Sequence, residues 1–295
     1  MRKALLALLG LYLLFIGCQK VVDADELLDT EEQVSIIGYI SPQDTILKIS
    51  VTKALPAIGT PVKVDQDYQF PEEFLIKDAL VNLSNTEGQS VVLDYDNETN
   101  TYVTSATNLQ ITHGHTYNLK VIVAEKEFNA SCQIPKQLEA INEIIEFQED
   151  EYGYEFAVIN VNFMDFSDEN NYYILGGYIS STIQFENEEP FEDIFPLYFD
   201  DDEFLTDNLG NGAQLNGKTE IYADSEYYSD VSITLQVAHT EKVLFDNLKA
   251  SQTNSDADGN PFVEYVIAPN NILDEGAIGV FSGYSVTEKV IDLKD

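Results

Sequence analysis

The residue with the most defined chemical role in this sequence is Cys18, near the start of the chain. It follows two basic residues, the apolar run 4–16 and the small residue Gly17, which is the layout of a secretory signal peptide ending in a lipidation motif. In such a motif the cysteine carries the lipid and becomes the first residue of the mature chain. A membrane-spanning anchor is the alternative, but a spanning helix needs about 20 apolar residues. We therefore predict a signal peptide over residues 1–17 and a lipid on Cys18.

Acidic and aromatic side chains are concentrated between residues 186 and 204, in a segment that we expect to form a loop. Like charges in a row usually mark a solvated loop, whereas an acidic rim around apolar anchors is typical of a recognition surface. The sequence predicts a loop that contacts a partner or ligand; aromatic side chains pointing into the core are the alternative, with slightly more in its favour. The residues of this predicted loop are Phe191, Phe195, Tyr198, Phe199, Asp200, Asp201, Asp202, Glu203 and Phe204.

A second acidic stretch, residues 254–260, resembles part of a calcium-binding loop. Alternating carboxylates before a glycine turn surround Ca²⁺ with hard oxygen ligands. A complete loop has Glu six residues after that glycine, whereas Glu264 follows Gly259 after five. We favour a polar turn here, with Asp256, Asp258 and Glu264 as the metal candidates, and expect no cofactor besides the lipid.

The other reactive side chains fit structural roles better than chemical ones. His113 and His115 flank Gly114, where a turn with positive φ is favoured over a zinc site, since zinc needs more ligands than His239 alone supplies. Cys132 lies in an alternating segment and is expected to be a buried thiol. No nucleophile elbow, phosphate loop or zinc-protease helix is present, so we expect no enzyme, although paired carboxylates for glycoside hydrolysis stay open. Two tyrosine clusters (172, 173 and 178; 222, 227 and 228) are assigned to the core rather than to sugar stacking.

The composition favours strands and excludes one class of partner. The formal net charge is −37, and a field of that sign repels nucleic acid. The chain has 17 Tyr, 16 Phe and many β-branched residues, which favour strands.

Short β-branched runs separated by turn residues predict antiparallel sandwiches. The expected strands are 34–41, 45–53, 79–84, 91–95, 101–104, 117–124, 128–134, 141–147, 154–166, 172–185, 231–239, 262–267 and 277–285. Apolar residues at helical spacing predict one helix over 241–251. Gly176 and Gly177 indicate a bulge or a close backbone approach, and residues 55–74 an extended loop that offers a contact surface.

These elements predict an all-β fold of two antiparallel β-sandwich modules, resembling immunoglobulin-like or prealbumin-like modules, with one short helix in the second. Pro135 ends the first module, since proline cannot continue a central strand. The expected organisation is a signal peptide (1–17), a lipidated acidic tether (18–32), an N-terminal β-sandwich module (33–137) and a C-terminal β-rich module (138–295).

The whole mature chain resembles the Bacteroidota lipoproteins of the family called domain of unknown function 4249. The resemblance rests on the lipidation motif, the pattern from Ala79-Leu-Val81 to Tyr117-Asn-Leu119, the segment Leu244-Phe-Asp-Asn-Leu248, and above all Gly259-Asn-Pro-Phe262 followed by Gly276-Ala-Ile-Gly279-Val-Phe281. It implies an outer-membrane lipoprotein, often encoded beside a TonB-dependent receptor, without assigned catalytic residues.

Together these features predict a non-catalytic outer-membrane lipoprotein that faces the cell exterior and serves as an accessory or cap subunit of a β-barrel complex such as a TonB-dependent transporter. The alternative is a surface lipoprotein that captures a glycan, nutrient or cation directly. The expected partners are an outer-membrane β-barrel protein and, through the lipid, the membrane, but no nucleic acid.

Overall fold

The computed structural model describes residues 33–54, 71–167, 170–183, 189–222, 228–257 and 266–293. The predicted signal peptide, Cys18 and the tether lie outside these residues, as does most of the loop predicted at 55–74. Among the described residues, no helix is long and apolar enough to cross a membrane.

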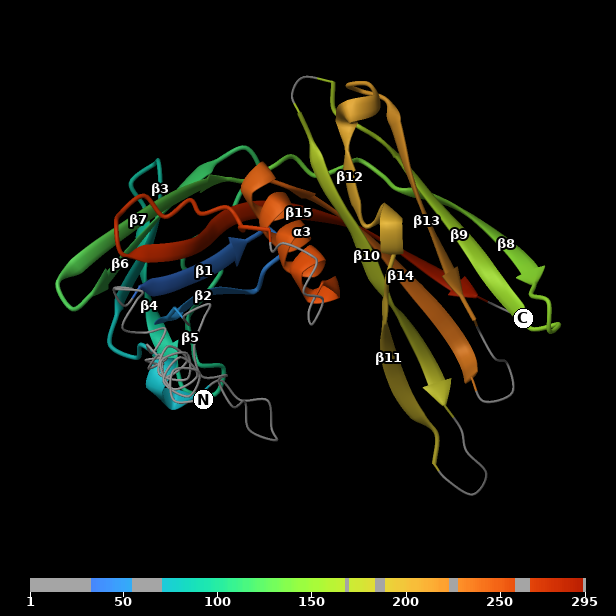
Figure 1. Cartoon of the computed structure of the whole chain (residues 1–295), viewed down its shortest axis with the longest axis horizontal. Coiled ribbons are helices and arrows are strands. Elements are labelled where there is room, and N and C mark those ends of the chain that lie inside the picture. Colours follow the sequence, from blue (N-terminus) through green and yellow to red (C-terminus); the bar gives the residue numbers. More distant parts are fainter. Residues whose placement is uncertain are drawn as a thin grey trace, which may run out of the picture.

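The predicted all-β fold with one helix is confirmed, because strands make up most of the described chain (Figure 1). The first strands are β1 Val34–Ile40, β2 Ile46–Lys53, β3 Leu80–Asn85, β4 Ser90–Asp96, β5 Thr101–Ser105, β6 Thr116–Val123 and β7 Lys126–Gln133. The later strands are β8 Asn142–Glu149, β9 Glu155–Met164, β10 Tyr172–Ile183, β11 Phe191–Leu197, β12 Phe204–Thr206, β13 Gln214–Ile221, β14 Tyr228–Thr240 and β15 Ala277–Leu293. Helix α3 spans Lys242–Asp256, and three 3₁₀ turns are η1 Glu72–Phe74, η2 Asp200–Asp202 and η3 Asp207–Leu209.

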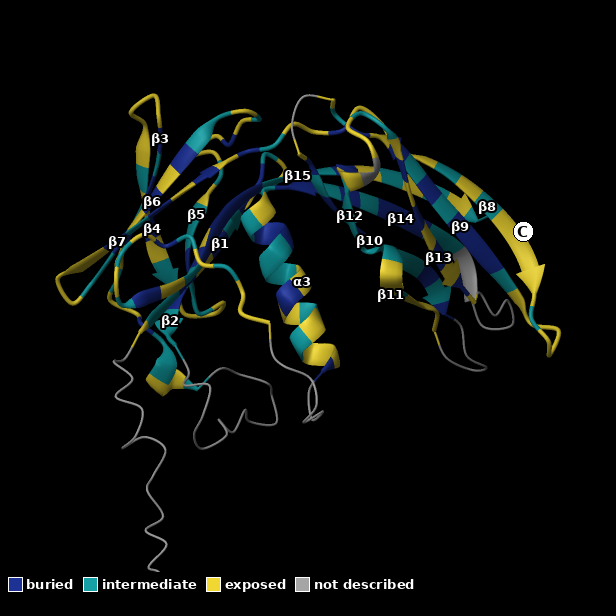
Figure 2. Ribbon diagram, turned by 45° about the horizontal axis from the view of Figure 1, so that its top comes forward, coloured by how far each residue is buried: buried dark blue, intermediate teal, exposed yellow. Residues whose placement is uncertain are grey.

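The strands form two sheets. A 12-stranded sheet has the order β11-β10-β14-β15-β1-β2-β5-β4-β3-β6-β7, with β12 beside β10, and a 3-stranded sheet has the order β13-β9-β8. The large sheet curves into an arch with α3 on its inner side (Figures 1 and 2). Strand β15 joins the two halves of the arch, since its first half pairs with β1 in parallel and its second half with β14 in antiparallel fashion.

The first half of the arch closes around one hydrophobic core, in which inward side chains of β1–β7 meet Phe281 of β15. Two buried tyrosines tie strands to loops within it. The Tyr117 hydroxyl donates to the Gln110 carbonyl and accepts from the Thr112 amide, both at 2.8 Å. This arrangement resembles the tyrosine corner of immunoglobulin-like sandwiches. Tyr102 makes the same kind of double contact, with Ile76 and Ala79.

A second core lies between the 3-stranded sheet and the β10, β14 and β15 part of the large sheet. Phe163 of β9 meets Tyr173 of β10 edge-on, with ring centroids 4.9 Å apart. The buried Tyr173 hydroxyl donates to Asp165 at 2.7 Å, so the polar end of this core tyrosine is satisfied. The large sheet runs without a break through both halves, and the division predicted at residue 137 stays a prediction.

Several sequence-based expectations differ from the structure. Helix α3 starts one residue later than predicted and continues to Asp256, five residues further. The strand predicted at 262–267 is not one at Val266 and Ile267, and its other residues lie outside the described part. Strand β13, with strictly alternating burial, was not predicted, because its small and polar residues carry little β propensity.

The glycine pair in β10 marks a close backbone approach rather than a bulge. A Cβ on Gly177, at φ 155°, would lie 2.1 Å from the Thr234 carbonyl oxygen of β14. The irregular register of β10 and β14 occurs later, between Ser180 and Thr182.

Candidate functional site

The predicted acidic and aromatic loop is in large part a strand. Residues 191–197 form β11, which pairs antiparallel with β10 at the edge of the large sheet. The loop prediction was wrong here because Glu192, Asp193 and Pro196 look like loop residues, whereas acids and proline are tolerated on an edge strand.

Four of the nine predicted contact residues have structural roles. Phe199 is only 2% exposed and belongs to the second core. Phe204 packs edge-on against Phe245 of α3, with ring centroids 5.4 Å apart. The Asp202 carboxylate accepts a hydrogen bond from the Lys218 amide at 2.9 Å. For these residues the core alternative is the better description.

Glu203 also faces inward, toward α3. Its Oε2 accepts from the Gln252 side chain at 3.0 Å. Burial raises the pKa of Glu203, and the nearby Asp200 and Asp256 carboxylates add to this effect. This carboxylate therefore joins η2 to the helix instead of facing a partner.

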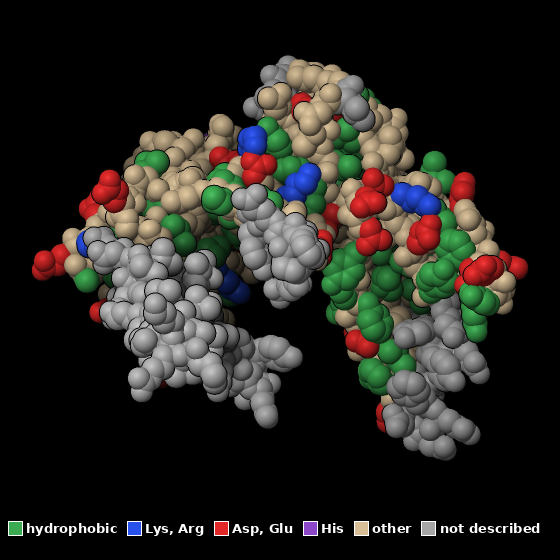
Figure 3. All heavy atoms as spheres, viewed as in Figure 1, with side chains coloured by type: hydrophobic (Ala, Val, Ile, Leu, Met, Phe, Trp, Pro, Cys, Tyr) green, Lys and Arg blue, Asp and Glu red, His purple; other side chains and the backbone are tan. Residues whose placement is uncertain are grey.

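Exposed apolar side chains lie on both faces of the arm that carries β10 and β11. We define the β11 patch as Tyr178, Phe191, Ile194, Phe195 and Tyr198, with exposed fractions of 36%, 45%, 60%, 36% and 64%. Phe191 and Phe195 share the face of the buried Leu197, whereas Ile194 and Tyr178 lie on the opposite face. Asp200 and Asp201 lie exposed beside it. Figure 3 shows hydrophobic side chains gathered on this arm with acidic side chains between them. Apolar anchors next to exposed carboxylates suit protein recognition.

The predicted metal site falls largely outside the described residues, since Asp258 and Glu264 lie there. Asp256 is the last residue of α3 and is exposed. The Asn254 side chain is occupied by Val266, accepting from its amide at 2.8 Å and donating to its carbonyl at 2.9 Å. Within the described ranges, no group of three or more His, Cys, Asp or Glu side chains could hold a metal ion.

The three histidines occupy separate places. His113 Nδ1 lies 2.9 Å from Ser285 Oγ, and His115 Nδ1 lies 3.7 Å from a Glu87 carboxylate oxygen. Gly114 between them has φ 77°, which confirms the predicted turn. His239 is buried, with Nδ1 2.8 Å from the Lys136 carbonyl oxygen.

Cys132 is buried as predicted, and burial raises the pKa of its thiol. A thiol of this kind is unreactive in the folded protein.

The tyrosine clusters divide between core and surface. Tyr173 is buried, and Tyr172 packs against Phe245 with ring centroids 5.3 Å apart. Tyr222, 62% exposed, stacks on Phe156. Tyr227 lies outside the described residues.

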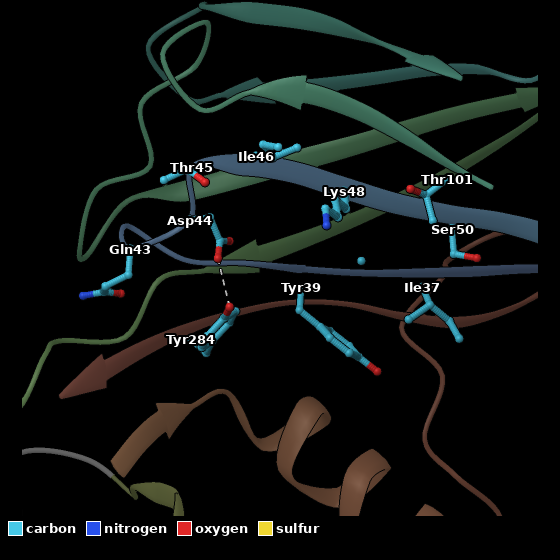
Figure 4. Close-up of a pocket in the computed structure, with 11 residues that line it drawn as sticks. Ile37, Tyr39, Gln43, Asp44, Thr45, Ile46, Lys48, Ser50, Thr101 and Tyr284 are labelled. Atoms are coloured by element: carbon cyan, nitrogen blue, oxygen red, sulfur yellow. Dashed lines mark hydrogen bonds between the residues drawn. The ribbon is translucent and has the colours of Figure 1, made fainter. Parts of the chain in front are cut away.

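A pocket of about 540 Å³ opens on the face of β1 and β2. Figure 4 shows Tyr284 of β15 pointing at Asp44, with Lys48 on β2 and Tyr39 on β1 nearby. The Tyr284 hydroxyl donates to Asp44 Oδ1 at 3.0 Å. Ile37 and Ile46, 42% and 49% exposed, supply apolar lining.

The electrostatics of this pocket follow from burial. Burial raises the pKa of Asp44, against the hydrogen bonds from the Ser41 amide and Tyr284. Burial and the neighbouring Asp44 raise the pKa of Tyr284 far above its usual value. The positive charge of Lys48 also acts against the raised pKa of Asp44, and its ammonium forms no hydrogen bond or ion pair with the described residues. A volume in this range, with a few convergent polar groups, is typical of a small-molecule site.

Sequence reasoning missed this pocket because its members come from distant parts of the chain. Asp44 and Tyr284 are 240 positions apart. Each is ordinary in its local sequence, and only the parallel pairing of β1 with β15 brings them together.

The fold defines an all-β protein with one helix. The chain belongs to the family described as domain of unknown function (DUF4249), whose model matches residues 20–290. The family resemblance seen in the sequence is thereby confirmed. No curated protein matches the chain.

Proposed function

We propose that this chain is a lipoprotein of the Bacteroidota outer membrane, anchored through a lipid on Cys18 and facing the cell exterior. It acts without catalysis, as an accessory or cap subunit of an outer-membrane β-barrel complex such as a TonB-dependent transporter. The observation that carries the proposal is the β11 patch, where exposed apolar side chains on the edge strand β11 and beside it adjoin exposed acids.

The patch is suited to a protein partner for three physical reasons. Aromatic side chains supply large contact areas at small entropic cost. They lie at the end of a sheet, where none of the described strands stands between them and a neighbouring surface. The net charge of −37 disfavours close approach to anionic head groups, so a lipid anchor plus a protein partner is the more favourable way to stay at a membrane.

The test is capture of the tagged, lipidated full chain from outer membranes in mild detergent. An integral β-barrel protein should copurify in near-equal amount. The double variant Ile194→Ser/Tyr198→Ser should lose about tenfold or more of that protein. Cys18→Ala should leave the chain without its lipid and out of the outer-membrane fraction.

The matched control is Val92→Ser/Leu273→Ser, which removes two exposed apolar side chains elsewhere on the surface. It should retain the barrel protein. Recovery of the lipidated wild type with no barrel protein would contradict the proposal.

Direct capture of a small ligand is the second candidate function, and the pocket at Asp44 and Lys48 favours it. Calorimetry of the full chain against CaCl₂ and a panel of oligosaccharides tests it. A ligand of this pocket should bind wild type and lose affinity about tenfold with Lys48→Ala, but not with Lys120→Ala, whose ammonium is paired with Glu127. If no ligand gives a heat of binding, the result would contradict this second candidate function.

A further inference from the structure

The edges of the two sheets are protected to different degrees. An exposed edge strand presents unpaired N–H and C=O groups, which invite another strand. The edge of β7 is covered from outside. The Asn129 amide donates to Asp274 at 2.8 Å, and the Leu273 amide donates to the Asn129 carbonyl at 2.9 Å. Further along, the Gln133 amide donates to Glu241 at 2.9 Å.

The edges of β13 and β11 are protected in other ways. On β13, the Lys218 amide is bound by Asp202 of η2. On β11, Pro196 has no N–H to offer, and the Ile194 amide donates to the side chain of Asp193 at 2.9 Å.

Strand β8 is an edge to which no other described segment gives such protection. It pairs with β9 in continuous register over residues 142–149. The Asp150 amide donates to the Tyr154 carbonyl just beyond this ladder. Because hydrogen-bonded and non-hydrogen-bonded pairs alternate in an antiparallel ladder, the amides of residues 143, 145, 147 and 149 point away from β9. No hydrogen bond from another described segment reaches them.

The inner face of β8 is also incompletely covered. Phe147 pairs across the sheet with the buried Ala157, so its side chain points toward the second core, yet it is 63% exposed. Across the second core, β8 faces the C-terminal end of β15. An ion pair between Lys289 of β15 and Glu143 of β8 connects the two strands. Figure 2 shows the end of β8 exposed beyond this point.

The negative charge of the β8 edge indicates the charge of the segment that would bind it. Strand β8, the turn that follows it and the first residue of β9 carry six acidic residues: Glu143, Glu146, Glu149, Asp150, Glu151 and Glu155. Of these, only Glu143 forms an ion pair among the described residues. A second copy of this chain would place equally acidic edges side by side, which is unfavourable. An extended segment rich in Lys or Arg would find both complementary charge and free backbone groups.

We propose that β8 binds an extended basic segment of a partner protein, added as a further strand along its free edge, with apolar side chains of that segment covering Ile145 and Phe147. Backbone hydrogen bonds supply affinity in this mode and the alternate side chains supply specificity. The site is distinct from the β11 patch and stands whether or not the barrel-docking role is correct.

The test uses the full chain and a synthetic ten-residue peptide in which Lys alternates with Val. Binding is followed by fluorescence anisotropy, and hydrogen exchange locates it. The expected result is saturable binding with slowed exchange of the amides of residues 145, 147 and 149. A peptide of the same length and charge, in which Pro replaces one central Val, should bind about tenfold more weakly, because a proline interrupts the added strand.

Variants separate strand addition from plain charge attraction. Phe147→Lys should weaken binding about tenfold, whereas Val92→Lys, with the same charge change on β4, should not. Slow exchange of the β8–β9 ladder amides in the unbound variant verifies that it is folded. Equal binding of both variants, or of the proline peptide, would overturn the proposal, as would sedimentation showing a dimer whose β8 amides are already protected.

Discussion

At the scale of single residues, Glu241 connects three parts of the molecule. It precedes α3, and its carboxylate accepts from the Gly283 amide and the Ser282 hydroxyl of β15 and from the Gln133 amide of β7, each at 2.9 Å. Burial raises its pKa, against these hydrogen bonds. This buried carboxylate therefore has a structural role, since it connects α3, β7 and β15 through hydrogen bonds. An abundance of acidic residues does not by itself indicate catalysis.

Replacing Glu241 by Ala should lower the free energy of unfolding by about 2 kcal/mol, because buried donors lose their acceptor. Glu241→Gln keeps one acceptor oxygen and should lose less. Urea unfolding of both variants and wild type measures these differences.

The pH dependence of the same variants tests the raised pKa. A carboxyl whose pKa is raised above 4.5 in the folded state contributes stability that is present below that value and is lost as the pH rises through the folded pKa. Glu241→Gln cannot ionise, so its stability relative to wild type should improve as the pH rises from about 4.5 to neutrality. Parallel pH profiles would contradict this assignment.

At the scale of elements, the pairing of β1 with β15 decides the architecture. It is the one parallel pairing among the described strands, and it connects residues more than 240 positions apart. Alternation predicted most of the strands, but it did not predict this pairing, because the sequence of a short strand does not specify which strand lies beside it. Strands β11 and β13 were also missed, because the acidic residues of β11 and the polar residues of β13 are typical of loops.

The substitution Gly279→Ala should break this pairing. Gly279 has φ 139°, and a Cβ there would lie 1.8 Å from the carbonyl oxygen of Ile36 on β1. We expect a loss of about 3 kcal/mol or more, seen as a lower denaturant midpoint.

Gly276→Ala is the matched control for backbone strain. Its φ is 91°, but the nearest atom to an added Cβ is the Lys126 ammonium, 3.9 Å away. It should cost about 1–2 kcal/mol. Equal losses for the two variants would show that strain, and not the contact with β1, governs this position.

At the scale of the whole molecule, charge and shape act together. A net charge of −37 destabilises the compact state through self-repulsion. The arch nevertheless keeps two separate cores under one continuous sheet. The contact surfaces that we propose on β8, on β11 and at the pocket lie on different parts of the arch.

Added salt should therefore stabilise the protein. Raising NaCl from about 0.01 M to about 0.15 M shortens the screening length from about 30 Å to about 8 Å. The melting temperature should rise by about 2–5 °C, equally for NaCl and KCl. A constant or falling melting temperature would contradict self-repulsion as a destabilising force.

Divalent ions extend this experiment to the predicted calcium site. At equal ionic strength, CaCl₂ and MgCl₂ should act alike if screening alone is at work. A further rise with CaCl₂, abolished by Asp256→Asn, would instead support calcium binding near residues 256–264.

The sequence by itself determined the all-β class, most strand positions, the single helix, the buried Cys132 and the family. These properties depend on local alternation, composition and motif spacing, which are complete within a short stretch of chain. Only the tertiary structure decided which acidic and aromatic residues of 191–204 are exposed, that Asp44 and Tyr284 share a pocket, and that no other described strand pairs with the outer edge of β8. Each of these depends on which distant strand lies alongside, and that is set by the packing of both cores rather than by any one segment.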